Sequence, residues 1–186
     1  MSEPLEAHLE GCRRFEARAQ KALYERLAPK MLAVCARYAR STPDAEDILQ
    51  DGFIKVFQKI EDYSGKGSLE GWVRSIIVRT AIDYYRKTKK QEKEVDIDEQ
   101  FTDELSEEMV DQLNVDYLLS VIQSLPSGYR MIFNLFAIEG YTHKEIAKQL
   151  GINESTSRSQ YTRARALLKK RISEDHQHKS IFRDVI

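Results

Sequence analysis

Residues 141–171 read YTHKEIAKQLGINESTSRSQYTRARALLKKR, and this stretch predicts two helices joined by a turn. Thr142 can cap the first helix, with Glu145 three residues later completing a capping box. Gly151 supplies the turn, because glycine adopts the positive φ that residues with a Cβ disfavour. Asn153 can then cap the second helix. The pattern predicts a helix-turn-helix.

The second of these helices has a small inner face and a polar, cationic outer face. Ser157, Tyr161, Ala164 and Leu168 fall at helical spacing and share the inner face. Arginine can bind guanine edges in a DNA major groove, and serine or threonine can contact either base type. We therefore predict DNA binding, against the alternative of an ordinary amphipathic hairpin with a solvated basic surface. The predicted base-facing residues are Ser155, Arg158, Ser159, Thr162 and Arg165, and the predicted phosphate contacts are Arg163, Lys169, Lys170 and Arg171.

Composition favours an all-α protein with packed cores. The 186 residues are 41% hydrophobic and 32% charged, with 8 glycines and 4 prolines. The net charge is −1, which taken alone argues against a nucleic-acid partner. The charges are segregated, however: residues 84–90 and 158–171 are basic, whereas 92–111 contain ten acids and one lysine. Local charge matters more than the total here.

The acidic stretch at residues 91–113 also divides the chain. Its low hydrophobicity and dense negative charge predict a linker that is disordered at least in part. We expect a helical domain over 1–90, a second helical domain over 114–172, and a tail over 173–186.

The N-terminal part begins with a short helix and a long one over residues 5–40, in which Pro29 is expected to kink or interrupt the long helix. The next helix begins at Ser41-Thr42-Pro43-Asp44, a hydroxyl cap followed by proline and acids. Its inward residues are predicted to be Ile48, Phe53, Val56, Phe57 and Ile60. Its largely acidic outer surface comprises Asp44, Glu46, Asp47, Gln50, Asp51 and Lys55, and composition leaves open whether that surface is solvated or docks a basic partner.

A loop over residues 62–68 precedes a further helix rich in cations. The loop lacks the G-x-x-x-x-G-K-[ST] pattern and no strand precedes it, so we reject nucleotide binding. Aromatic rings interleaved with cations are typical of a surface that binds single-stranded nucleic acid, although Trp72 and some tyrosines could be core residues instead. The aromatic residues are Tyr63, Trp72, Tyr84 and Tyr85, and the cations include Lys66, Arg74, Arg79, Arg86, Lys87, Lys89 and Lys90.

No pattern predicts catalysis, a metal site or a cofactor. Cys12 and Cys35 are too few for a disulfide framework and fall in helical patterns, so we expect buried or free thiols. His143, on the first turn of its helix, is expected to be exposed rather than catalytic. No secretory or membrane-spanning run is present, and the reducing cytoplasm is the expected compartment.

Three motifs in order resemble the ECF subfamily of bacterial RNA polymerase sigma factors. They are DAEDILQDGFIKVF (44–57), WVRSI (72–76) with TAIDYYRK (80–87), and SLPSGYRMIFNLFAIEGYTHKEIAKQLGINESTSRSQYTRARALLKKR (124–171). The resemblance covers nearly the whole chain except the tail. It implies a protein that binds core RNA polymerase and directs initiation at promoters.

The resemblance also implies site residues. Polymerase contacts to the clamp helices of the largest subunit would come from Asp44, Glu46, Asp47, Ile48, Gln50, Asp51 and Phe53, with a further contact at the flap. The loop 63–68 with Trp72 and Arg74 would open the upstream-ten element, and Arg79 to Lys90 would hold the DNA backbone. The linker would thread the RNA-exit path. Arg158, Ser159 and Thr162 would read the upstream-thirty-five element, with Arg163 and Arg165 on phosphates. An anti-sigma partner is common in the family.

This chain departs from the family pattern at three positions. Arg79 replaces a common asparagine before the T-A-x-D motif, Ser157 replaces a common valine on the inner face, and Gln160 replaces a cation. Two rival functions are a dimeric helix-turn-helix regulator that acts without polymerase and a protein that sequesters polymerase without directing initiation. A dimeric regulator has no need of the acidic helix or the aromatic loop.

Overall fold

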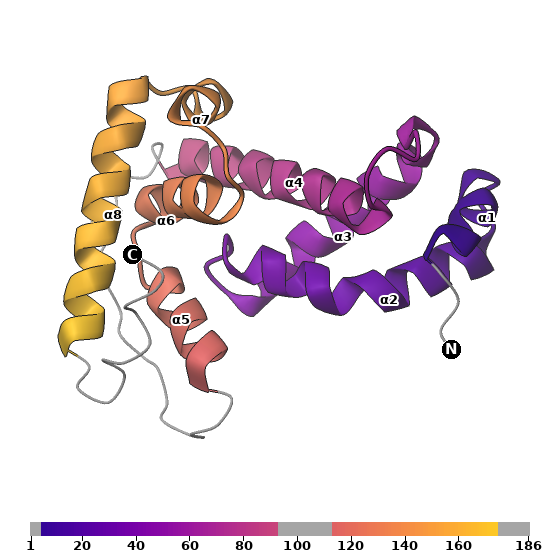
Figure 1. Ribbon diagram of the computed structural model, residues 1–186, viewed down its shortest axis with the longest axis horizontal. Helices are drawn as coiled ribbons and strands as arrows, with labels where there is room; N and C mark the ends of the chain where they lie inside the picture. The colour runs from indigo at the N-terminus through magenta and orange to yellow at the C-terminus, as the bar shows by residue number, and fades with distance from the viewer. Residues whose placement is uncertain (1–4, 93–112, 175–186) are drawn as a thin grey trace. The chain divides into compact units, whose positions relative to one another are not determined.

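The computed structural model of the protein describes residues 5–92 and 113–174 (Figure 1). The described residues form helices and contain no strand, which confirms the all-α prediction. The chain divides at Tyr84 and Tyr85 into two compact units, residues 1–84 and 85–186. Most of the predicted linker, at 93–112, and of the predicted tail, at 175–186, lies outside the described residues.

The first unit is built around three long helices, the last of which continues past residue 84. η1 (Leu5–His8) and α1 (Leu9–Arg13) lead into α2 (Ala17–Ala36), followed by α3 (Thr42–Gln58), η2 (Ile60–Asp62) and α4 (Leu69–Glu92). The predicted interruption at Pro29 is wrong, because α2 continues through that residue, whereas a kink there stays a prediction. Its buried face, with Leu23, Leu27 and Met31, outweighs the one backbone hydrogen bond that proline removes.

Helix α3 starts and packs as its sequence predicts. The Ser41 hydroxyl accepts a hydrogen bond from the Asp44 amide at 3.3 Å, and a proline occupies the first turn. Gly52 permits close packing on α4, because a Cβ there would lie 2.3 Å from the Ile77 Cδ1 atom. An ion pair of 3.2 Å between Lys55 and Asp83 joins the same two helices. Helix α3 therefore makes both an apolar contact and an ion pair with α4.

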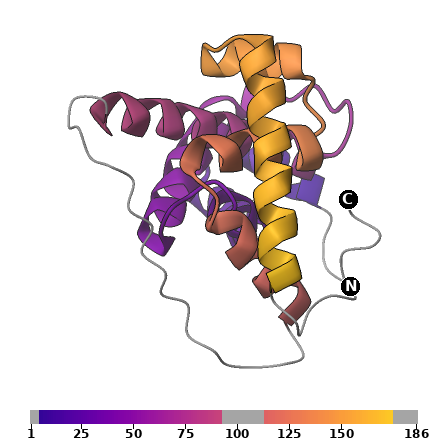
Figure 2. The ribbon, with the colours of Figure 1, turned by 90° about the vertical axis from the view of Figure 1, so that its left-hand side faces the viewer.

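Residues 113–174, which the structure describes in the second unit after α4, contain five helical segments. They are α5 (Leu113–Gln123), α6 (Ser127–Phe133), the π-helical turn η3 (Asn134–Ile138), α7 (His143–Leu150) and α8 (Glu154–Glu174). Helix α8 is the longest of these and stands in the foreground of Figure 2, with α7 at one end. The buried residues Val121, Ile122, Leu125, Ala164, Leu168 and Ile172 form a core between α5 and α8.

Both cysteines are buried free thiols, as predicted. Burial raises the pKa of the Cys35 thiol to about 12, so the thiol stays protonated at neutral pH. Within the ranges that the structure describes, no helix combines the length and apolar character needed to cross a membrane.

Candidate nucleic-acid interface

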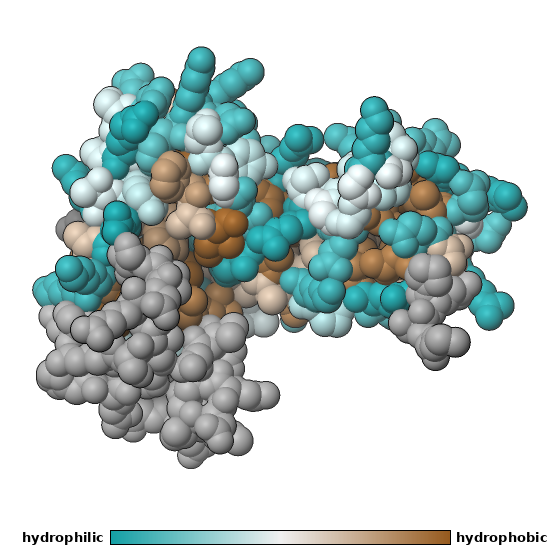
Figure 3. Space-filling model, in the orientation of Figure 1, coloured by the Kyte–Doolittle hydropathy of each residue, from teal (hydrophilic) through white to brown (hydrophobic). Residues whose placement is uncertain are grey.

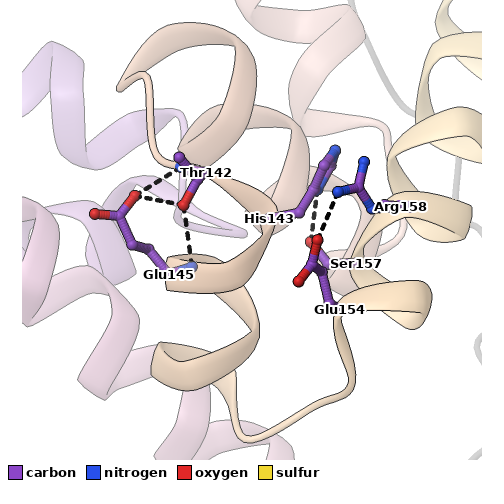
Figure 4. A network of polar contacts seen from close by, with 6 residues as sticks. All are labelled: Thr142, His143, Glu145, Glu154, Ser157 and Arg158. Carbon is purple, nitrogen blue, oxygen red and sulfur yellow. Dashed lines mark hydrogen bonds and ion pairs between the residues drawn. The ribbon is translucent and has the colours of Figure 1, made fainter.

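Helices α7 and α8 form the predicted helix-turn-helix. The Thr142 hydroxyl accepts from the Glu145 amide at 3.3 Å, and the Glu145 carboxylate accepts from the Thr142 amide at 2.8 Å, which completes the capping box (Figure 4). Gly151 ends α7 with φ of 65° and ψ of 37°, in the left-handed region. Asn153 immediately precedes α8, and its carbonyl accepts from the Ser157 amide at 3.1 Å.

The inner face of α8 is fixed to α7 by a buried polar contact. Ser157 is fully buried, and its hydroxyl shares a hydrogen bond of 2.9 Å with Nδ1 of His143 (Figure 4). The imidazole stacks on Phe136 with ring centroids 4.1 Å apart and meets the ring of Tyr161 edge-on at 5.7 Å. Ser157, in place of an aliphatic residue, therefore fixes the rotation of α8 about its own axis relative to α7.

The expectation that His143 is exposed is wrong, because its side chain is only 8% exposed. Burial lowers the pKa of His143 below its ordinary value, and the nearby Arg158 guanidinium lowers it further against an opposing effect of Glu154. The imidazole therefore stays neutral at neutral pH. The residues that contact the imidazole come from η3 and α8, so the spacing of residues within α7 could not indicate that His143 is buried.

The predicted DNA contacts on α8 are exposed, except for Arg171, which is partly buried. The exposed residues are Ser155, Arg158, Ser159, Thr162, Arg163, Arg165, Lys169 and Lys170. The Ser159 hydroxyl donates to the Thr156 carbonyl at 3.0 Å, and the Thr162 hydroxyl donates to the Arg158 carbonyl at 3.1 Å. Both hydroxyl oxygens consequently present acceptor lone pairs outward in this conformation. The surface over α7 and the adjoining end of α8 is largely hydrophilic on the face drawn in Figure 3.

The loop of the first unit is organised around a buried ring. Tyr63 is only 4% exposed, and its hydroxyl donates to the Gly67 carbonyl at 2.8 Å. Arg13 donates to the Tyr63 carbonyl at 2.9 Å, so α1 supports the start of the loop. Gly65 and Gly67 both have positive φ, and nothing lies within 4 Å of where their Cβ atoms would be. The buried ring of Tyr63 presents no face on which a base could stack.

The remaining predicted DNA contacts outside α8 lie on or before α4. Trp72 is partly buried, with its ring 5.6 Å from that of Tyr63, and Arg74 is partly buried as well. The cations Lys66, Arg79, Arg86 and Lys87 are exposed.

The predicted polymerase-binding residues of α3 fall into two groups. Glu46, Asp47, Gln50 and Asp51 are exposed. Ile48 and Phe53 are core residues, 1% and 3% exposed, so neither offers a surface for direct contact. Asp44 is partly buried and accepts a hydrogen bond of 2.6 Å from the Tyr84 hydroxyl, whose pKa is raised to about 12 by burial and by this bond.

The sequence reading missed Ile54, which is 55% exposed on the same surface of α3. It lies three residues after Asp51 and four after Gln50, so the three side chains are neighbours on the helix. An exposed apolar residue among acids was detectable from this spacing. We name Asp47, Gln50, Asp51 and Ile54 the α3 face.

These features define a class of protein: a helical DNA-binding protein of two units, one with a helix-turn-helix and the other with an exposed acidic helix beside an aromatic loop. Comparison with known proteins gives the family. The models for Sigma-70 region 2 and Sigma-70 region 4 match residues 23–91 and 116–168, respectively.

Two named relatives support the same family. The RNA polymerase sigma factor SigZ of Bacillus subtilis is 30% identical over 125 residues, covering 67% of this chain and 70% of the relative. The ECF RNA polymerase sigma factor SigE of Mycolicibacterium smegmatis is 30% identical over 148 residues, and the match covers 76% of this chain but only 57% of SigE. The chain belongs to the ECF subfamily of RNA polymerase sigma factors. It is therefore a promoter-directing partner of core polymerase, not a regulator that acts without it.

One solved structure supports the fold. The sigma factor RpoE in complex with the anti-sigma factor NepR, from Bartonella quintana, aligns with a TM-score of 0.53 and 21% identity over 84% of this chain and 98% of that one.

Proposed function

We propose that this sigma factor docks on core RNA polymerase through the α3 face, opens promoter DNA with residues 63–74, and reads an upstream element with the outer face of α8. The observation that carries the proposal is the division of α8 into two faces. Its inner face is fixed by the buried Ser157–His143 contact, while every predicted base-facing residue of its outer face is exposed. A rigid helix with outward arginine and hydroxyl groups suits a major groove.

Docking combines charge with one apolar anchor. The carboxylates of Asp47 and Asp51 would meet a basic surface of the polymerase, and Ile54 would be buried between the partners. Complete burial of an isoleucine side chain contributes about 1.5–3 kcal/mol. Ile48, Phe53 and Asp44 keep a part in docking, but as residues that position the helix, since their side chains pack inside the unit or bond to Tyr84.

Opening is proposed for the loop and the start of α4. Tyr63 fixes the loop through its bond to Gly67, so we reassign it from base stacking to positioning. Trp72 is only partly buried, and Lys66, six residues earlier in the loop, is exposed. Stacking on an aromatic ring contributes about 1–3 kcal/mol per base, which offsets the few kcal/mol needed to unstack one. Arg79, Arg86 and Lys87 would neutralise the backbone along α4.

The two DNA-binding units act jointly. Fixed by polymerase at one separation, each raises the effective concentration of the other at the promoter, and the spacing of the two elements becomes part of specificity. We assign polymerase docking and opening to residues 1–90 and upstream reading to 114–172. We expect the protein to work in the cytoplasm without a catalytic step of its own.

Ile54→Asp tests the docking surface. The variant should bind core RNA polymerase at least about tenfold more weakly, because a charge replaces the apolar anchor. Phe15→Asp is the matched control: Phe15 is the other large apolar residue exposed among the described ones, at 62%, and lies off the α3 face. Its φ of 57° suits aspartate better than phenylalanine. Equal polymerase affinity for the Ile54→Asp variant and the parent would contradict the proposed surface.

A further inference from the structure

An acid lies beside the main base-reading candidate of α8. The Glu154 carboxylate accepts a hydrogen bond from Nη2 of Arg158 at 2.5 Å, one helical turn away (Figure 4). The two side chains are 43% and 63% exposed, so the pair lies at the outer surface. Exposed pairs of this kind contribute little to helix stability. On a surface meant to meet phosphates, a carboxylate also opposes binding.

The ion pair leaves Arg158 able to bind DNA. A guanidinium carries five N–H donors in a rigid fork, and a bidentate grip on guanine O6 and N7 uses two of them. Glu154 engages Nη2, and further donors remain on the same group. The carboxylate can therefore stay in place while Arg158 reads a base.

The main chain of Arg158 is fixed independently. Its neighbour Ser157 is held by His143 on the inner face, and the Arg158 carbonyl accepts from the Thr162 hydroxyl. Only the torsions of the long arginine side chain remain to be restricted. The ion pair with Glu154 restricts them before DNA arrives, which lowers the entropy lost on binding.

We propose that Glu154 is a positioning residue that directs the Arg158 guanidinium toward one base edge and thereby sets selectivity for guanine at one position of the upstream element. The inference rests on the proposed function, because it requires α8 in a major groove. The carboxylate acts in two ways: it orients the fork, and it makes a sequence-independent phosphate contact by Arg158 less favourable.

The test uses full-length protein assembled with core RNA polymerase, on promoters whose upstream element is randomised. Arg158→Ala should abolish the guanine preference at one position. Glu154→Ala should reduce the preference at that same position by about tenfold, with far-UV circular dichroism unchanged. The double variant should match Arg158→Ala, since Glu154 acts through Arg158.

Three results would overturn the inference while leaving the proposed function intact. The first is an unchanged preference in Glu154→Ala at the position that Arg158→Ala relaxes. The second is relaxation at a different position, which would make Glu154 a base reader itself. The third is uniformly tighter binding to every sequence, which would reduce Glu154 to a repulsive charge. By contrast, if the parent selects no upstream sequence and Arg158→Ala changes nothing, the assignment of α8 as the reader fails.

Discussion

The Ser157→Ala substitution tests how the recognition helix α8 is held against α7. Ser157 is fully buried, and its hydroxyl is bonded to Nδ1 of His143. Alanine removes the hydroxyl and leaves a buried imidazole nitrogen without that partner. One face of the imidazole is covered by Phe136, with ring centroids 4.1 Å apart. A second effect of the change, the shorter side chain, is small beside the lost hydrogen bond.

The expected cost follows from that geometry. A buried polar group left unsatisfied costs about 1–3 kcal/mol, so we expect the free energy of unfolding of the second unit to fall by about 2 kcal/mol. With an m value of about 1.5 kcal/mol per M, the urea midpoint should fall by about 1.3 M. The first unit should be unaffected, because neither residue belongs to it.

The chain offers a way to separate the two units in one assay. Its single tryptophan, Trp72, lies in the first unit, whereas helices of both units contribute to far-UV circular dichroism. Urea titration of the full chain followed by both signals should show a destabilised transition in circular dichroism and an unchanged one in tryptophan fluorescence. Ser155→Ala, an exposed serine two residues earlier, is the control and should shift stability by less than about 0.5 kcal/mol.

A double-mutant cycle completes the experiment. If the hydrogen bond is the cause, His143→Ala and Ser157→Ala should be coupled by at least about 0.5 kcal/mol. Additive effects, or a Ser157→Ala variant as stable as the Ser155→Ala control, would refute the reasoning. A shift of the tryptophan transition would show that the substitution acts elsewhere.

Three further outcomes are expected. Because the pKa of His143 is lowered in the folded state, the unfolded chain binds a proton more readily, so the second unit should lose stability as pH falls below about 6.5. Urea titrations of the parent and of His143→Gln across that pH range should show a smaller loss of stability in the variant, and an equal dependence of stability on pH in the two proteins would contradict the assignment. Gly151→Ala, at φ of 65°, should destabilise the second unit by about 1 kcal/mol in the same titration, and no change would argue against the left-handed turn. Trp72→Ala in holoenzyme should reduce promoter opening, followed by permanganate reactivity of unpaired thymines, more than duplex binding; a variant with normal opening but lower stability would place Trp72 in the core.

Local chemistry made the helix-turn-helix predictable. Thr142, Glu145 and Gly151 act within a few residues of one another, so their capping and turn geometry could be read from spacing alone. The start of α3 at Ser41 was predictable for the same reason. These are contacts that a chain makes with its own neighbours.

The predictions that failed concern which side chains are buried and which are exposed. Tyr63 looked like a stacking residue because it lies among cations, yet packing beside Trp72 places its ring inside the unit. His143 looked exposed because α7 alone does not show that Phe136 and Ser157 cover it. Helical spacing placed Ile48 and Phe53 in the core, but the resemblance also assigned them to docking, whereas the exposed Ile54 was overlooked. Each of these depends on contacts between helices.

The most direct test of a promoter-directing function is transcription in vitro with core RNA polymerase on pooled promoter fragments, with and without this protein. We predict selective transcripts whose promoters share two short upstream elements at a fixed spacing, with the farther element changed in preference by Arg158→Ala. Transcripts without shared elements, or tight binding to polymerase with no selective initiation, would contradict the mechanism.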